Sequence, residues 1–203
     1  MHIACLHTAE SNIAVFEAAL AEIGAARGRG ARLRHAVHPA LLAEAEAAGG
    51  LTPEIAARTA TLLRQMAAEG EAVLLTCSTL GPAAEGTGAL RADAALARRA
   101  VAEGGQVSVL CAVATTLAPT RALFTAAAAA TGAEVTVILV PGAWDAFRAG
   151  DREGYLDRVA RAAEAAPGRV ALAQASMAGA AGRVRGVRPL TSPEVALESV
   201  LGF

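Results

Sequence analysis

The sequence predicts an α/β protein built from two similar lobes, each with a parallel sheet. Short apolar runs alternate with amphipathic helical segments along the 203 residues, which is the pattern of β-α-β units. The order β-α-β-α-β occurs twice, and each copy takes about half of the chain. We expect a first lobe over residues 1–90, a second over 91–190, and a C-terminal helix at 191–203 that packs back on the first lobe.

Three apolar runs in the first half predict strands, at 2–7, 31–37 and 72–77. Two helices are expected between them, over 11–25 and from Pro53 to about Glu69. Ser11 or Asn12 would cap the first helix, and Thr52 would cap the second. Gly70 follows the second helix and favours its termination there.

The second half repeats this alternation. Its apolar runs predict strands at 106–114, 134–140 and 169–176. Helices are expected over 89–103, from Pro119 to near Gly132, over 151–166 and over 191–201. In open parallel sheets ligands bind outside the carboxyl ends of the strands, so the residues that follow each apolar run are the candidate site residues.

Composition excludes several classes of function. The formal net charge is −1, so no basic face is expected and nucleic acid is not a predicted partner. The chain has no lysine, which excludes a Schiff-base lysine, a pyridoxal phosphate anchor and a Walker lysine. No apolar run is long enough to cross a bilayer, and the N-terminus lacks the order of a signal peptide. We therefore expect a cytoplasmic protein with no membrane partner.

The cysteines and histidines show no metal-binding spacing. There are three cysteines, Cys5, Cys77 and Cys111, and four histidines, His2, His7, His35 and His38. Neither a CxxC pair nor an HExxH motif occurs, so the sequence predicts no metal site and no disulfide framework. Cys5 and Cys111 lie inside apolar runs and are expected in the core. Cys77 follows a buried run beside hydroxyl residues, which favours a functional thiol over an ordinary buried residue.

Polar residues gather after four of the predicted strands. The first-half clusters are His7-Thr8-Ala9-Glu10-Ser11-Asn12 and Thr76-Cys77-Ser78-Thr79. The second half offers Thr115, Thr116 and Thr120 after one strand, and Gln174-Ala175-Ser176-Met177 after another. Hydroxyls and backbone amides of this kind can hold a carboxylate. The glycine-rich turn of a dinucleotide site is missing.

Three segments carry a resemblance to the aspartate/glutamate/hydantoin racemase superfamily. VLLTCSTLGP, at 73–82, is similar to that family's first cysteine motif, in which a polar residue and threonine follow the cysteine. ATTLAPT, at 114–120, resembles the threonine-rich loop of its second lobe. VALAQASMAG, at 170–179, resembles its second cysteine motif, with Ser176 where the cysteine is expected. The resemblance extends along the whole chain in order and spacing.

The resemblance implies two flavodoxin-like lobes with a cleft between them and a reaction that uses no cofactor. In that superfamily two cysteines, one per lobe, move a proton on opposite faces of a carbon next to a carboxylate. Carried over, Cys77 is the first acid/base, Ser176 takes the second position, and the substrate is a small amino acid or related carboxylate. Relatives are often dimers, which leaves a homodimer open.

The same strand ends supply the expected substrate-binding residues: Thr8, Ser11, Asn12, Ser78, Thr79, Thr115, Thr116, Thr120 and Met177. His7 and Glu10 would tune Cys77 by charge or hydrogen bonding, or belong to a surface loop. Trp144 and Phe147 would cover a core edge, or else line the cleft mouth or a subunit contact.

The serine at 176 leaves three functions open. A serine hydroxyl is a far weaker acid than a thiol, which titrates near ~8.5, so a symmetric two-thiol racemase does not fit these residues. The main prediction is a cofactor-independent racemase or isomerase with Cys77 as its general acid/base. The alternatives are a single-base decarboxylase or lyase of the same superfamily, and a catalytically silent carboxylate-binding protein.

Overall fold

The computed structural model describes residues 1–28 and 31–203, which form two four-stranded sheets with every strand pair parallel. The first sheet has the order β2-β1-β3-β4 and contains β1 (His2–His7), β2 (Arg32–Val37), β3 (Ala72–Leu75) and β4 (Leu90–Arg91). The second has the order β6-β5-β7-β8 and contains β5 (Gln106–Cys111), β6 (Glu134–Leu139), β7 (Arg169–Leu172) and β8 (Leu190–Thr191). The predicted two-lobed α/β fold is confirmed.

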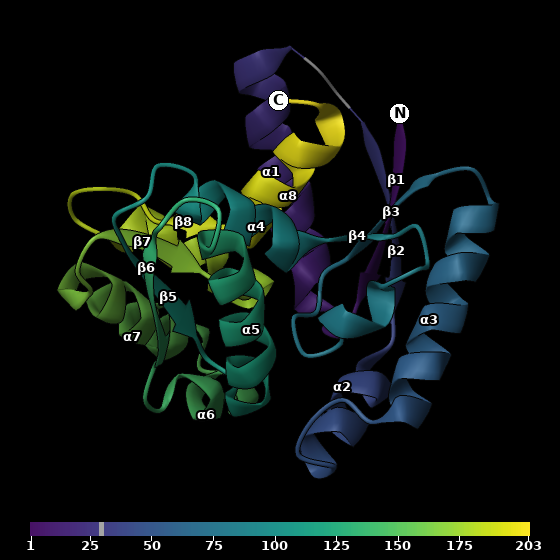
Figure 1. The fold of residues 1–203 in the computed structure, drawn as a ribbon, viewed down its shortest axis with the longest axis horizontal. Helices are drawn as coiled ribbons and strands as arrows, with labels where there is room; N and C mark the ends of the chain where they lie inside the picture. Colours follow the sequence, from purple (N-terminus) through teal and green to yellow (C-terminus); the bar gives the residue numbers. More distant parts are fainter. Residues whose placement is uncertain (29–30) are drawn as a thin grey trace.

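Helices lie on both faces of each sheet (Figure 1). The α-helices are α1 (Ser11–Arg27), α2 (Pro39–Ala47), α3 (Pro53–Ala68), α4 (Ala92–Val101), α5 (Leu117–Ala128), α6 (Ala143–Arg148), α7 (Arg152–Ala165) and α8 (Ser192–Leu201). Three short 3-10 segments are η1 (Gly81–Ala84), η2 (Ala114–Thr116) and η3 (Ala175–Arg183). Helices α1, α4 and α8 lie between the two sheets, and α3 and α7 lie on the outer sides. No helix of the described residues combines the length and hydropathy needed to cross a membrane.

The side-chain alternation of β1 shows how each sheet is covered. Ala4 and Leu6 face the cluster that contains Leu63 of α3, whereas Ile3 and Cys5 face the opposite side with Phe16 of α1. In a strand, successive side chains point to opposite faces, so both faces of this central strand are buried. This arrangement explains why the predicted strands appear in the sequence as continuous apolar runs.

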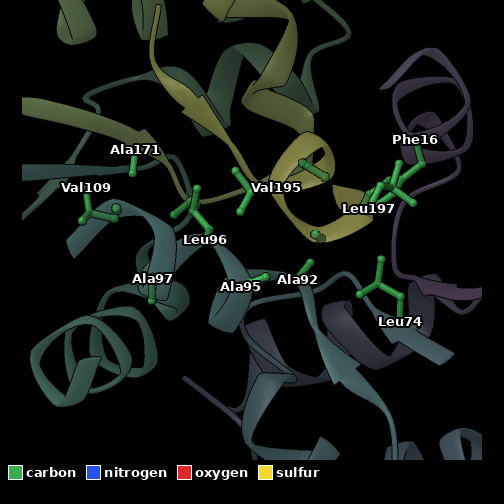
Figure 2. Close-up of a cluster of buried hydrophobic side chains, with 14 of the residues drawn as sticks. Phe16, Leu74, Ala92, Ala95, Leu96, Ala97, Val109, Ala171, Val195 and Leu197 are labelled. Carbon is green, nitrogen blue, oxygen red and sulfur yellow. The ribbon is translucent and has the colours of Figure 1, made fainter. Parts of the chain in front are cut away.

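A single hydrophobic cluster joins the two halves of the molecule (Figure 2). Leu96 of α4 and Val195 of α8 lie in this cluster with Val109 of the second sheet and Leu74 of the first. Fully burying one such aliphatic side chain contributes about 1.5–3 kcal/mol. Helix α8 contacts both α1 and α4. The sheets divide the chain between β4 and β5, and the predicted lobe boundary at residue 90 remains a prediction.

The helix starts were predicted with mixed success. The Thr52 hydroxyl accepts a hydrogen bond from the Ile55 amide at 3.3 Å, so the predicted cap of α3 is confirmed. The predicted cap of α1 by Ser11 or Asn12 is wrong, because the turn already begins at Glu10, whose backbone is helical, and no side chain caps it. The Asn12 side chain does not cap the helix and is instead buried in its first turn, where it lines the cavity described below.

Several strands end earlier than their apolar runs predicted. Strand β3 ends at Leu75 rather than residue 77, β5 at Cys111 rather than 114, and β7 at Leu172 rather than 176. The residues beyond these ends form loops and 3-10 turns at one edge of each sheet. Apart from the 3-10 segments, the elements that were not predicted are the helices α2 and α6 and the two-residue strands β4 and β8. The shortened strands place the polar clusters in loops.

Candidate functional site

A small cavity lies where the carboxyl ends of β1, β3, β5 and β7 meet. Its lining comes from both halves of the chain: Thr8, Ala9, Asn12, Leu42, Thr76, Cys77, Ser78, Thr79, Val113, Thr116, Trp144, Phe147, Gln174, Ala175 and Ser176. The volume is about 40 Å³. A space of this size holds little more than water, so a substrate enters only when the two halves or their loops move apart.

Cys77 lies in the loop after β3 with its sulfur at this cavity. Burial raises the pKa of the Cys77 thiol, and this effect outweighs hydrogen bonds from the Thr8 side chain and from the Leu80 and Thr79 backbone amides, which lower it. The free protein therefore holds Cys77 as a neutral thiol. The three donors stabilise a thiolate once a proton has been removed.

Two hydroxyls that were predicted to hold substrate connect the halves of the molecule. The Ser78 hydroxyl donates to the Ala173 carbonyl at 3.2 Å, and the Thr79 and Thr115 hydroxyls are 3.3 Å apart. Ser78 and Thr79 follow the first sheet, whereas Ala173 and Thr115 follow strands of the second. These contacts hold the cavity in its closed form.

Ser176 lies in η3 and is paired with a buried tyrosine. The Ser176 and Tyr155 hydroxyl oxygens are 2.7 Å apart. Burial raises the pKa of the Tyr155 phenol above its usual value, and the hydrogen bond with Ser176 opposes that rise. Ser176 also borders a larger groove of about 490 Å³ between α1, α7 and η3.

The sheet register places Gln174, not Ser176, at the position equivalent to Cys77. Leu75 is the last residue of β3 paired with β1, and Leu172 is the last residue of β7 paired with β5. Two residues further along the chain these strands reach Cys77 and Gln174, respectively. By this register Gln174 lies level with Cys77, and Ser176 lies two residues further along the chain. The catalytic role of Ser176 remains a prediction.

Gln174 is held by the end of the neighbouring strand. Its side-chain oxygen accepts hydrogen bonds from the Ala112 and Val113 backbone amides, the second at 3.2 Å. Ala112 and Val113 directly follow β5. An amide side chain does not ionise near neutral pH, so this position anchors the loop and does not act as an acid or base.

Comparison with solved structures identifies this architecture. The chain is similar to an aspartate racemase homologue from Pyrococcus horikoshii, with a TM-score of 0.65, 13% identity, and coverage of 99% of this chain and 97% of the other. It is also similar to an allantoin racemase from Klebsiella pneumoniae, with a TM-score of 0.64, 16% identity, and coverage of 100% and 89%. The chain has the fold of these racemases.

A third solved structure with this racemase fold is the allantoin racemase from Pseudomonas fluorescens. Its TM-score is 0.55 with 16% identity, and the match covers 100% of this chain and 92% of the other. No protein-family model matches the sequence, and no curated protein matches it. The similarity to known racemases is therefore one of fold, and the chemistry has to be argued from the residues of this chain.

Within the racemase fold, the predicted site residues fall into two groups. The cavity lining includes Cys77, Ser176, Thr8, Asn12, Ser78, Thr79 and Thr116, and Thr115 contacts it through Thr79. Of the others, Met177 is fully buried in the cluster beneath α7, and Thr120 is buried beside Cys111. Ser11 and Glu10 are exposed at the start of α1, and Ser11 borders the larger groove. The structure does not bring these last four residues into the cavity.

His7 lies beneath the cavity rather than in it. Its ring is fully buried, and Nδ1 is 2.8 Å from the Thr76 hydroxyl. Burial, together with the nearby His35 ring, lowers the pKa of His7 to about 4. The side chains of Cys5, His7 and His35, whose potential ligand atoms lie within 4.8 Å of one another, also lie outside the cavity lining.

Trp144 and Phe147, for which the sequence allowed several positions, form an aromatic wall of the cavity. The Trp144 and Phe147 rings of α6 stack with centroids 4.8 Å apart and line the cavity. The indole Nε1 of Trp144 and the Oδ1 of Asn12 are buried and have no hydrogen-bond partner. A buried polar atom without a partner costs free energy, so both atoms are available to a ligand. Of the described residues that line the cavity, none has a basic side chain.

Proposed function

We propose that this protein is a cofactor-independent isomerase of the racemase type, which moves a proton at a carbon next to the carbonyl or carboxylate group of a small molecule. Cys77 is its general acid/base. The observation that carries the proposal is the position of the Cys77 sulfur in a cavity that both lobes line, within reach of three hydrogen-bond donors.

The chemistry follows from these donors. Proton transfer from carbon requires a base, so the Cys77 thiol first gives its proton to solvent when the lobes open. The Thr8 side chain and the Thr79 and Leu80 amides then stabilise the thiolate. Removal of the proton leaves negative charge on the oxygen of the enolate. Fixed hydroxyl and amide dipoles at the strand ends stabilise such charge, and Ser78 and Thr79 supply them here after the lobes open.

Ser176 is the proposed proton donor on the face of the substrate opposite Cys77. The Ser176 hydroxyl is hydrogen-bonded to the Tyr155 hydroxyl, with the two oxygens 2.7 Å apart. A proton that leaves Ser176 can therefore be replaced from the phenol. Serine is a much weaker acid than a thiol, which makes proton delivery by Ser176 and proton removal by Ser176 unequal. Because the equilibrium constant between two enantiomers is 1, we expect this inequality to appear as unequal kcat values that are balanced by unequal KM values in the two directions.

The cavity favours a substrate group that is neutral and has both a donor and an acceptor. The unpartnered Asn12 oxygen needs a donor, and the unpartnered Trp144 N–H needs an acceptor. A small carboxylate, the substrate predicted from the sequence, would rest on hydroxyls and backbone amides alone, since the described lining has no basic side chain. We therefore include amides and ureides of small amino acids with the acids themselves as candidate substrates.

Deuterium exchange tests this function directly. Candidate acids, amides and ureides are incubated with the protein in deuterated water, and loss of the α-proton signal is followed by NMR. We expect exchange with wild type and a loss of at least about 100-fold in Cys77→Ala. Cys111→Ser, which alters a buried cysteine outside the cavity, is the matched control and retains the rate. Equal exchange in wild type and Cys77→Ala contradicts the proposal, and no exchange in any sample supports a silent binding protein.

A one-base reaction is the second candidate, and Gln174 is the observation that favours it. The position level with Cys77 holds the Gln174 amide, which accepts hydrogen bonds from the backbone and does not ionise near neutral pH. A decarboxylase or lyase needs only one residue to protonate the planar enolate. Incubation of a prochiral disubstituted malonate distinguishes this reaction, because Cys77 would give a single product enantiomer.

A further inference from the structure

Three potential metal ligands meet on the inner face of the first sheet. Cys5 and His7 are two residues apart on β1 and therefore share a face, and His35 on β2 is the register partner of Cys5. The Cys5 sulfur and one ring nitrogen of each histidine all lie within 4.8 Å of one another. Cys5 and His7 are fully buried, with the Phe16 ring of α1 5.3 Å from the His7 ring.

The hydrogen bonds of His7 establish which of its nitrogens carries the proton. The Thr76 hydroxyl donates to the Leu6 carbonyl at 3.0 Å. Its oxygen therefore accepts from His7 Nδ1 at 2.8 Å, and Nδ1 is the protonated nitrogen. The Nε2 atom of a neutral His7 then carries a lone pair, which points toward His35.

The same reasoning applies to His35. Its Nε2 lies 3.1 Å from the Glu17 carboxylate, which only accepts hydrogen bonds, so Nε2 carries a proton. The His35 Nδ1 atom faces His7 Nε2 at 2.8 Å. Two lone pairs at this distance repel each other, so the pair requires a cation between or beside the two nitrogens: an additional proton or a metal ion.

We propose that Cys5, His7 and His35 bind a zinc ion. An additional proton would satisfy the two nitrogens but leaves Cys5 without a role, whereas two imidazoles and a thiolate are ligands that zinc prefers. Ligand atoms around a tetrahedral zinc ion are about 3.3–3.6 Å apart. Binding therefore requires the two ring nitrogens, which lie 2.8 Å apart, to separate slightly within a cluster whose three ligand atoms all lie within 4.8 Å of one another. A water molecule would take the fourth position.

The surroundings of the three residues fit this assignment. Metal-bound histidines usually donate their outer N–H to an oxygen, and here Thr76 and Glu17 accept from His7 and His35. Binding would release the Cys5 thiol proton to solvent. The charge of the ion is then balanced by the thiolate and by the Glu17 carboxylate. His35 is on the edge strand β2 and partly exposed, which gives the ion a path of entry.

The ion would reinforce the wall of the cavity from below. His7 is directly followed by Thr8, and its hydrogen-bond partner Thr76 is directly followed by Cys77. Binding therefore ties the ends of β1 and β3 together beneath the thiol. The sequence predicted no metal because the ligands have no motif spacing and are brought together only by the register of β1 and β2.

Cobalt provides the test, since Co²⁺ substitutes for zinc and is coloured. The full-length protein, prepared without a histidine tag and stripped with a chelator, is titrated with Co²⁺. We expect one Co²⁺ per chain, visible d–d bands, a near-ultraviolet thiolate-to-cobalt band, and displacement by zinc with a Kd below about 1 µM. Cys5→Ser removes the near-ultraviolet band, and His35→Gln, at a partly exposed position, weakens binding at least 10-fold. Cys111→Ser is the matched buried-cysteine control and keeps the full spectrum.

Two outcomes overturn the proposal. One is failure of wild type to bind Co²⁺ or zinc in this range while its circular dichroism shows a folded protein. The other is a near-ultraviolet band that persists in Cys5→Ser. In the first case, nitrogen NMR of the histidine rings would show the additional proton between His7 and His35. Neither outcome bears on the exchange activity proposed for Cys77.

Discussion

The Thr79 and Thr115 hydroxyls lie 3.3 Å apart, one beyond each sheet, and join the two lobes beside the thiol of Cys77. The nearby bond from Ser78 to the Ala173 carbonyl joins the lobes a second time. With only about 40 Å³ between them, the walls of the cavity have to separate before any substrate reaches the sulfur. The hydroxyls that bind substrate in the open form are thus the groups that hold the free protein closed.

Thr115→Val removes one of these contacts and keeps the shape of the side chain. A hydrogen bond contributes about 0.5–1.5 kcal/mol, so the open form becomes roughly 2- to 10-fold more populated. We expect alkylation of Cys77 by iodoacetamide, followed by mass spectrometry, to accelerate by the same factor. Thr61→Val, on the exposed surface of α3, is the control and leaves the rate unchanged. A rate that is unchanged or lower in Thr115→Val would mean that this contact does not limit opening.

The pH dependence of Cys77 follows from its burial. Because burial raises the pKa of the Cys77 thiol above its usual value, the free protein holds very little thiolate at neutral pH. Alkylation of Cys77 is expected to increase with pH and to reach half its maximum above pH 9. The folded state also holds its proton more tightly than the unfolded state, so stability falls as pH rises past the usual thiol value. A half-maximum below pH 8 would indicate an activated thiol in the free protein.

Gln174 has a structural role that is measurable without knowledge of the substrate. Gln174→Leu leaves the Ala112 and Val113 amides without their acceptor, which costs about 1–3 kcal/mol of unfolding free energy. Urea denaturation measures this loss. Gln65→Leu, at an exposed position on α3, is the control and changes stability by less than about 0.5 kcal/mol. Equal stability of the two variants would show that the Gln174 bonds contribute nothing to the closed loop.

The sequence predicted the sheets well because buried parallel strands leave continuous apolar runs. It did not predict where those runs stop being strands: Ala173 continues the apolar pattern of β7, although the strand ends at Leu172. The match of Ser176 to the second cysteine came from the resemblance of VALAQASMAG, whereas the sheet register sets Gln174 level with Cys77. The early end of β7 also places Met177 in a 3-10 turn, which directs it into the hydrophobic cluster beneath α7.

Contacts between distant segments were beyond the reach of sequence patterns. The bond between Ser176 and Tyr155 joins η3 to α7, and the His7–His35 pair depends on the register of two strands. Helix α2 was missed because its burial involves few residues, Leu41 and Ala45, on one side of a short alanine-rich segment. The expectation that ligands bind beyond the carboxyl ends of parallel strands nevertheless located Thr8, Cys77 and the hydroxyls around them. That expectation depends on chain direction and not on side-chain contacts.

Tyr155→Phe tests the proposed role of the Ser176–Tyr155 pair in proton delivery. The ring is buried against Phe147 with centroids 5.3 Å apart, so phenylalanine keeps the packing and removes only the hydroxyl that supports Ser176. Exchange of the α-proton through Cys77 should stay within about 3-fold of wild type, whereas inversion of configuration should fall by at least about 10-fold, because general-acid assistance on that face is lost. The two rates are measured together by NMR and chiral chromatography, and Ser176→Ala should give the same pattern. Equal losses in the rates of exchange and inversion would mean that Tyr155 only maintains the structure of the cavity. No loss in either rate would exclude Ser176 from the proposed mechanism and leave Cys77 as a single base.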